Sequence, residues 1–121
     1  MTLSWLYRKY RGGNKGVEPE NVAVGTFESE DFLFVNAERA CVVYVYDIGS
    51  SRNPKFWQAL PTNVGPEGGL AIPKAHIFVV ANDVGHDHKV RSTITIYEYA
   101  KGRHQYPTLS KIPTIPFRAS V

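Results

Sequence analysis

A polar stretch in the second half of the chain, "NDVGHDHKVR" at residues 82–91, carries most of the side chains that could bind a metal ion. Histidine nitrogens beside a carboxylate suit a transition metal, and carboxylate and amide oxygens suit calcium. The two histidines stand two residues apart, so they converge on one ion only if the loop bends, and no further ligand pair with a recognised metal spacing follows. A polar hairpin loop is the alternative, because asparagine, aspartate and glycine favour turns. The candidate ligands are Asp83, His86, Asp87 and His88, with Asn82 beside them and calcium as the candidate divalent cation.

A second group of charged side chains stands where strands would end or turn. Glu20 and Glu67 each follow a proline, and carboxylates at equivalent positions of neighbouring sheets could share a cation. Arg39 and Arg91 could bind a phosphate group directly. The alternative is structural: carboxylates at strand ends commonly accept hydrogen bonds within turns, and Glu38 would pair with Arg39 on the surface. The candidate ligand-binding residues are therefore Glu20, Glu67, Arg39 and Arg91, and Glu38, Asp47 and Glu98 are further acids near strand ends.

Motifs for nucleophilic or nucleotide chemistry are missing from the sequence. Ser92 opens a strand-like run, but no G-x-S-x-G elbow surrounds it and no histidine–aspartate pair is tied to it by spacing. "GPEGG" has the glycines of a phosphate-binding loop without the lysine or a following helix. Catalytic residues therefore stay unassigned. Alternating tyrosines could stack on nucleobases, but Asp47 and Glu98 beside them would repel phosphate, so a nucleic-acid partner is not expected.

The elements that must position these side chains are predicted to be β-strands. Valine, isoleucine and aromatic residues dominate short runs bounded by turn residues, and no segment keeps a helical apolar period. The tail from Tyr106 is rich in proline and is expected to be extended and poorly ordered. The predicted strands cover residues 21–25, 32–37, 41–48, 55–60, 69–73, 76–82 and 92–99.

This strand pattern occurs twice. "PE" at 19–20 aligns with "PE" at 66–67, "FV" at 34–35 with "FV" at 78–79, and "YD" at 46–47 with "YE" at 97–98. A period in the forties predicts an all-β fold of antiparallel β-propeller blades, in which the Pro-Glu turn leads into the innermost strand of each blade. About two blades make an incomplete propeller, since closure needs at least about four. A piece of a longer protein, an assembly of several copies and a two-sheet sandwich are the alternatives. The predicted organisation is a basic N-terminal segment at 1–13, a first blade-like repeat at 14–61, a second at 62–109 and a Pro-containing tail at 110–121.

Length and composition agree with one small globular domain. The chain has 121 residues, of which 43% are hydrophobic and 21% charged, and its net charge of +3 comes from sparse bases near both ends. Cys41, the single cysteine, lies in an apolar run and is expected to be a buried thiol. No apolar run reaches the roughly 18 residues of a membrane span, and the first residues do not form a secretory signal.

Three stretches carry a resemblance to a known family: "NKGVEPENVAVG", "FLFVNAERACVVYVYDI" and "NPKFWQALPTNVGPEGGLAIP". Together they resemble the β-propeller region of phytase-like (esterase-like) proteins and the related choice-of-anchor propellers, and "VRSTITIYEY" continues the match to the phytase-like group. The resemblance covers about residues 14 to 110. Asn21 stands where the family usually has glycine after the first Pro-Glu, which affects one turn.

The resemblance implies an extracellular or cell-surface propeller with more blades than this chain holds, so the expected partners are the remaining blades of a parent propeller or further copies of the chain. The leading hypothesis is a structural or ligand-binding module of a larger protein. A metal-assisted phosphoester or carboxylester hydrolase, implied by the resemblance alone, is the second hypothesis. A small interaction domain that associates through its edge strands is the third.

Overall fold

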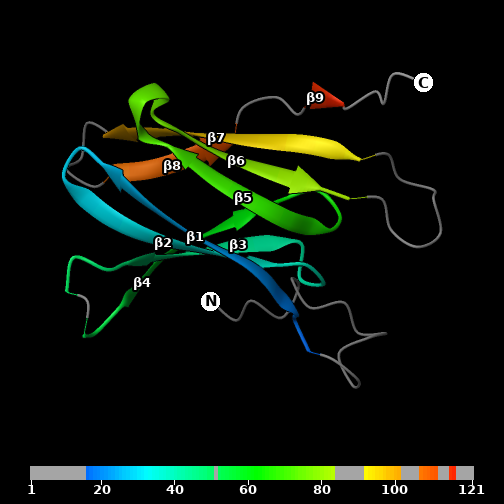
Figure 1. Cartoon of the computed structure of the whole chain (residues 1–121), viewed down its shortest axis with the longest axis horizontal. Coiled ribbons are helices and arrows are strands. Elements are labelled where there is room, and N and C mark those ends of the chain that lie inside the picture. Colours follow the sequence, from blue (N-terminus) through cyan, green and yellow to red (C-terminus); the bar gives the residue numbers. More distant parts are fainter. Residues whose placement is uncertain (1–15, 51, 84–91, 102–106, 112–114, 117–121) are drawn as a thin grey trace.

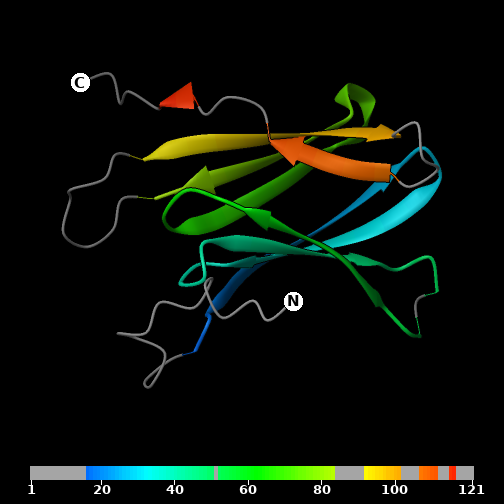
Figure 2. The ribbon, with the colours of Figure 1, turned by 180° about the vertical axis from the view of Figure 1, so that it is seen from behind.

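The computed structural model describes residues 16–50, 52–83, 92–101, 107–111 and 115–116. Within this part, two antiparallel sheets lie face to face (Figure 1), and the view from behind shows the same two layers (Figure 2). The first sheet has the order β1 (Pro19–Phe27), β2 (Glu30–Ala37), β3 (Val42–Asp47) and β4 (Lys55–Pro61). The second sheet has the order β5 (Pro66–Ile72), β6 (Ile77–Asn82), β7 (Thr93–Lys101) and β8 (Pro107–Lys111), with the 3-10 turn η2 (Pro73–Ala75) before β6 and β9 (Ile115–Pro116) beside β7.

The prediction of an all-β antiparallel chain is confirmed, and the seven predicted strands correspond to β1–β7. The described residues contain neither a closed barrel nor a closed propeller, so the blade interpretation goes beyond what the fold shows. The tail was expected to be poorly ordered, but β8 pairs with β7 from Pro107 to Lys111. Proline at the first residue of an edge strand leaves the following N–H groups free to pair, which explains the difference.

Left-handed backbone marks the hairpins of the first sheet. Glu28 and Ser29, with φ of 47° and 72°, form the two-residue connection from β1 to β2, where two positive φ angles match the twist of the strands. Cys41 has φ of 52° in the turn before β3. Its thiol is free and half-buried, so the expectation of a buried thiol was wrong: the buried part of the apolar run begins one residue later, with Val42.

The hydrophobic core fills the space between the two sheets. Phe34 of β2 stacks on Phe78 of β6 with ring centroids 3.9 Å apart and an interplanar angle of 10°, and both side chains are fully buried. Phe27 of β1 stacks on Tyr99 of β7 at 5.0 Å. The buried core is completed by Phe32, Val43, Val45, Leu60, Val80, Tyr97 and Leu109. Aromatic contacts of this kind fix how the sheets lie on each other as well as removing apolar area from water.

Hydrogen bonds also cross between the sheets. Asn21 Oδ1 accepts from Gly69 N at 3.0 Å. The Gln58 amide exchanges two bonds with the backbone of Leu109, at 2.9 and 3.1 Å. These contacts join β1 to β5 and β4 to β8, so each sheet places its first strand against the first strand of the other.

The two sheets share a β-bulge at the same place in their first strands. The register shifts between Pro19 and Asn21 in β1 and between Pro66 and Gly68 in β5. A bulge leaves one extra residue unpaired and bends the strand. Superposing the two bulges aligns Glu20 with Glu67. The two Pro-Glu pairs, predicted to be turns before the strands, are therefore the bulged first residues of β1 and β5.

This superposition relates opposite faces of the two sheets. Gly25 and Ala71 face each other between the sheets, since a Cβ on Gly25 would lie 2.5 Å from that of Ala71. The superposition nevertheless carries Val24 onto Ala71 and Gly25 onto Ile72. Because side chains alternate along a strand, Val24 lies on the outer face of its sheet and its equivalent Ala71 lies on the inner face of the other. Carried through the pairings, Phe34 falls on Val79, one residue from the Phe78 that the sequence alignment suggested.

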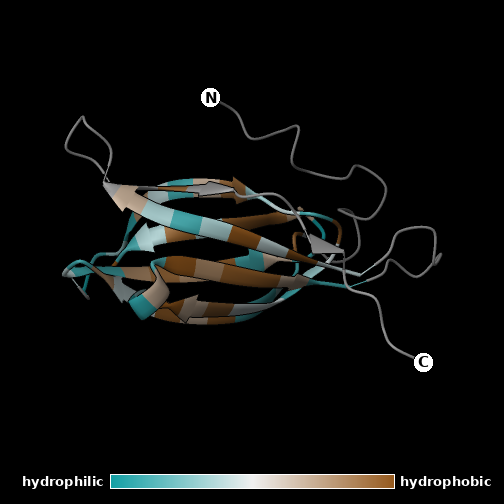
Figure 3. Ribbon diagram, turned by 90° about the horizontal axis from the view of Figure 1, so that it is seen from above, coloured by the Kyte–Doolittle hydropathy of each residue, from teal (hydrophilic) through white to brown (hydrophobic). Residues whose placement is uncertain are grey.

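The outer faces, turned away from the other sheet, are also apolar, and apolar segments recur along the strands of both sheets in Figure 3. Val22 and Val24 of the first sheet are 58% and 61% exposed, and Leu70 of the second is 60% exposed. Phe56 of β4, 54% exposed, packs edge-on against Tyr46 of β3. Half-buried apolar side chains on the same faces are Leu33, Val35, Tyr44, Ile72, Val79, Ile94 and Ile96.

Candidate functional site

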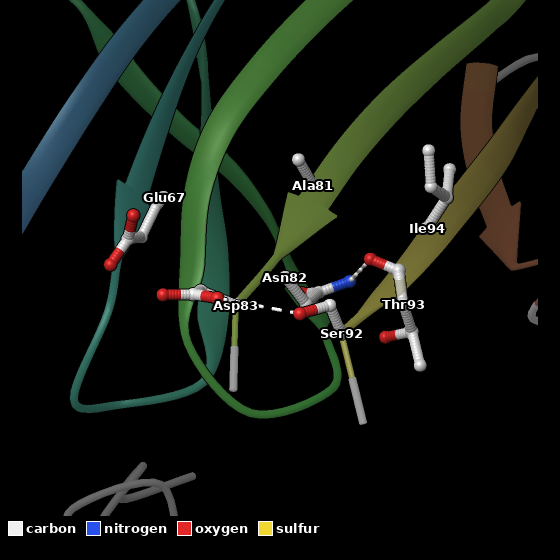
Figure 4. Close-up of a pocket in the computed structure, with 7 residues that line it drawn as sticks. All are labelled: Glu67, Ala81, Asn82, Asp83, Ser92, Thr93 and Ile94. Carbon is white, nitrogen blue, oxygen red and sulfur yellow. Dashed lines mark hydrogen bonds between the residues drawn. The ribbon is translucent and has the colours of Figure 1, made fainter. Parts of the chain in front are cut away.

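A cavity of about 370 Å³ opens where β5 begins, β6 ends and β7 begins (Figure 4). Asn82 and Thr93 are paired residues of β6 and β7, so the antiparallel ladder brings these two strand ends side by side. The lining residues are Glu67, Ala81, Asn82, Asp83, Ser92, Thr93 and Ile94.

Asn82 is the most constrained polar side chain of this cavity, being only 3% exposed. Its Nδ2 donates to Thr95 Oγ1 at 2.8 Å and to Thr93 O at 3.3 Å. These acceptors determine which end of the amide is nitrogen, and they leave the buried Oδ1 without a hydrogen-bond partner. This oxygen is itself buried, so it is not accessible to a ligand in the cavity as the side chain stands.

Two carboxylates lie at the same cavity. Asp83 is anchored through its N–H, which donates to Gly65 O at 2.8 Å, and Ser92 Oγ donates to Asp83 Oδ1 at 3.4 Å. Glu67 is the exposed bulge residue of β5. Glu67 and Asp83 were predicted in two separate candidate sets, and the fold brings both to one cavity with Asn82. Their oxygens are acceptors, so the charge of this site suits a cation or an amine better than a phosphate.

A second acidic site joins the start of β1 to the turn after β2. Ligand oxygens of Glu18, Glu20 and Glu38 lie within 4.8 Å of one another, which is close enough for one cation. The backbone holds this arrangement, because Glu38 N donates to Glu18 O at 2.9 Å. Arg39 Nε donates to Glu18 Oε2, with side-chain exposures of 15% and 16%. Arg39 was expected to pair with Glu38 if it was not a phosphate ligand, and the structure directs its Nε to Glu18 instead.

The ionisation of this cluster follows from crowding. The pKa of Glu38 is raised, first because burial disfavours the charged carboxylate, and then because Glu18 shares a hydrogen bond with it and repels its charge. The pKa of Arg39 is raised chiefly by its hydrogen bond to Glu18. A cation would relieve the repulsion among the three glutamates, but Arg39 already supplies one positive charge.

The remaining predicted residues divide between structural roles and the undescribed part of the chain. Asp47 Oδ1 accepts from Gly49 N at 2.8 Å, which is a turn contact of the expected kind. Glu98 is exposed on β7. His86, Asp87, His88 and Arg91 lie outside the described residues.

Sequence reasoning missed Glu18 as a site residue and missed the buried amide of Asn36. Glu18 lies two residues before Glu20 in "EPE", which was the available signal. Asn36 is fully buried between the sheets, and neither its Oδ1 nor its Nδ2 has a hydrogen-bond partner in the described structure. Asn36 follows Phe32 and Phe34 at a spacing of two, and strand alternation places these three side chains on one face, so that spacing was the available signal.

Comparison with known proteins relates the first part of the chain to a family model. The family model of the choice-of-anchor I domain matches residues 7–51, which reach from before β1 to just past β3. No curated protein and no solved structure matches the chain. In the described part of the chain, no helix has the length and apolar character needed to cross a membrane.

Proposed function

We propose that this chain is a two-sheet segment of a β-propeller and acts as a structural or ligand-binding module of a surface-associated protein. In this proposal residues 14–61 and 62–109 are the two repeats, and each repeat supplies the four strands of one blade, β8 continuing to Lys111. The support comes from the equal strand orders, the shared bulge, the relation between the faces and the apolar outer surfaces.

The relation between the faces is the observation that carries the proposal. In a sandwich built by a two-fold axis, equivalent side chains face each other across the interface. In a propeller, rotation about one axis carries the front of one blade onto the front of the next, so equivalent side chains point the same way around the ring. Val24 points away from the second sheet, and its equivalent Ala71 points toward the first. This relation is the one expected between neighbouring propeller blades and not the one expected of a two-fold sandwich, which supports the proposal.

The apolar outer faces support the same conclusion. A two-sheet sandwich has one core, and its outer faces alternate toward polar residues. Here Val22, Val24 and Leu70 are each more than half exposed, and most of their neighbours on these faces are valine, leucine or isoleucine. A blade inside a propeller has both faces covered, so its sequence carries apolar residues on both.

The match to the choice-of-anchor I domain supports surface association. An extracellular or cell-surface location is part of the proposal, and so is a ligand site at the carboxylates of Glu67 and Asp83 that takes a cation, calcium being the candidate. No observation on the described residues favours the hydrolase or the edge-strand interaction domain, and neither is carried forward.

The proposal is tested by asking whether the outer faces need a cover. The purified chain is expected either to self-associate, measured by light scattering, or to bind an apolar dye. Val24→Lys should weaken both signals without loss of the far-ultraviolet β signal, whereas Asn53→Lys, which places the same charge in an exposed loop, should not. A monomer that binds no dye, unchanged by Val24→Lys, would show a complete sandwich and refute the proposal. Labelling of intact cells by an antibody to the chain tests the surface location.

A further inference from the structure

We infer that copies of this chain associate head to tail, with the outer face of the first sheet of one copy packed on the outer face of the second sheet of the next. The inference rests on the proposed function, since it uses the same relation between the sheets, and it adds the partner and the register. Both faces are on each copy, so one chain supplies both halves of the interface.

The contacts of this interface follow from those inside the chain. The displacement that carries the first sheet onto the second also carries the second sheet onto the first sheet of the next copy. Gly25 and Ala71 meet inside the chain, and their equivalents are Ile72 and Val24. Ile72 of one copy should therefore contact Val24 of the next.

The aromatic stack between the sheets has an equivalent of the same kind. Phe34 and Phe78 stack at 3.9 Å inside the chain. Their equivalents through the pairings are Val79 and Leu33, which are half-buried and lie on the outer faces. Val79 of one copy should contact Leu33 of the next, so the predicted contact between copies is apolar, like the contact between Phe34 and Phe78 inside the chain.

A third pair of equivalent residues is apolar between the copies, whereas its counterpart inside the chain is a hydrogen bond. Asn21 and Gly69 are hydrogen-bonded inside the chain, and their equivalents are Gly68 and Val22. Val22 is 58% exposed, and a small residue opposite it leaves room for its methyl groups. None of the three pairs contains an ionisable side chain, so the association removes apolar area from water without burying a charge at these contacts.

The correspondence between the faces favours head-to-tail packing over packing of like faces. The outer face of the first sheet is equivalent to the inner face of the second sheet. Inside the chain, the inner face of the second sheet packs on the inner face of the first sheet. The outer face of the second sheet superposes on the inner face of the first. Heterologous contacts close into rings when the rotation allows it. Propellers of roughly four to eight blades correspond to two to four copies, so a discrete mass of two to four times 13.6 kDa is expected.

Directed disulfide formation tests the register in the full chain. All variants carry Cys41→Ser, which removes the native thiol. One preparation carries Val24→Cys and another Ile72→Cys, and the two are mixed under mild oxidation and analysed without reductant. The matched control replaces Val24→Cys by Thr26→Cys, two residues further along the same face of β1. Circular dichroism verifies that each variant keeps its β signal.

The expected result is a disulfide-linked heterodimer of the Val24→Cys and Ile72→Cys chains, roughly tenfold or more above either homodimer and above the Thr26→Cys control. Homodimers of Val24→Cys would mean that like faces pack together, which overturns the inference while the proposed function stands. An oligomer without any cross-link also overturns the register. A chain that is monomeric at every concentration overturns the association, and binding of an apolar dye by that monomer would keep the proposed function.

Discussion

Removing the ring of Phe34 tests whether the two sheets form one cooperative unit. Phe34 is fully buried and stacks on Phe78 with ring centroids 3.9 Å apart. Replacement by alanine leaves a cavity between β2 and β6 that neither sheet can close without moving the other. Phe34→Ala should therefore lower the free energy of unfolding by about 3–5 kcal/mol. That is a large share of the roughly 5–15 kcal/mol available to a domain.

The matched control is Phe56→Ala, because the same ring is 54% exposed there and meets Tyr46 edge-on at 5.9 Å. Its loss should stay below about 1 kcal/mol. Urea unfolding followed by circular dichroism gives both values, provided that protein concentrations are matched so that self-association contributes equally. Equal losses for Phe34→Ala and Phe56→Ala would refute the packing of the two sheets on each other.

A double-mutant cycle then isolates the stack itself. Phe34→Leu and Phe78→Leu keep the positions apolar but remove the ring contact. The two changes should show a coupling energy of about 0.5–1.5 kcal/mol beyond additivity. Additive losses would mean that the rings contribute only as buried area.

Three further predictions concern close approach, a cross-sheet hydrogen bond and ionisation. A Cβ on Gly69 would lie 2.8 Å from the ring of the β6 phenylalanine, so Gly69→Ala should destabilise by about 1–3 kcal/mol, whereas Gly68→Ala, whose nearest contact is 3.7 Å, should be near neutral in the same urea assay. Tyr97→Phe removes the hydroxyl that donates to Pro61 O and should lower stability by about 0.5–1.5 kcal/mol; no change would mean that water replaces this bond. The pKa of Glu38 is raised above 4.5 in the folded state, so the stability of the fold should decrease as pH rises through that pKa. Glu38→Gln should therefore melt at a higher temperature than the wild type at pH 7, and this difference should vanish below pH 4.5. An equal difference at every pH would mean that ionisation of Glu38 is not its cause.

The positions of the β-strands could be predicted from the sequence because strand formation depends on residues that are close together in the chain. Alternating apolar residues in "FLFVNA" and "CVVYVYDI" and the turn residues between them predict β2 and β3 whatever lies opposite. The alignment of Glu20 with Glu67 was also predicted correctly, since both are bulge residues, although the Pro-Glu pairs begin strands and are not turns. A bulge forms within one pair of neighbouring strands, so nearby proline and glycine residues in the sequence can indicate it.

Contacts between distant segments were not readable in this way. The approach of Glu18 and Glu20 to Glu38, and the meeting of Glu67 with Asp83, depend on how strands far apart in the chain are registered. A shift of one residue reverses which face a side chain occupies, and the sequence alignment of Phe34 with Phe78 contained such a shift. The expectation for the tail was wrong at residues 107–111, because these residues pair with β7 although a nearby proline locally favours an open chain.

The amino-acid sequence by itself determined that this protein is made of short antiparallel strands in two similar sets, because β propensity and turn chemistry act within a few residues. Only the tertiary structure decided which faces meet, and with them the buried stack of Phe34 on Phe78, the orphaned oxygen of Asn82 and the outer faces left apolar. Those features arise from packing and pairing across the chain, where the free energy of burial selects one arrangement among the several that the same local pattern permits.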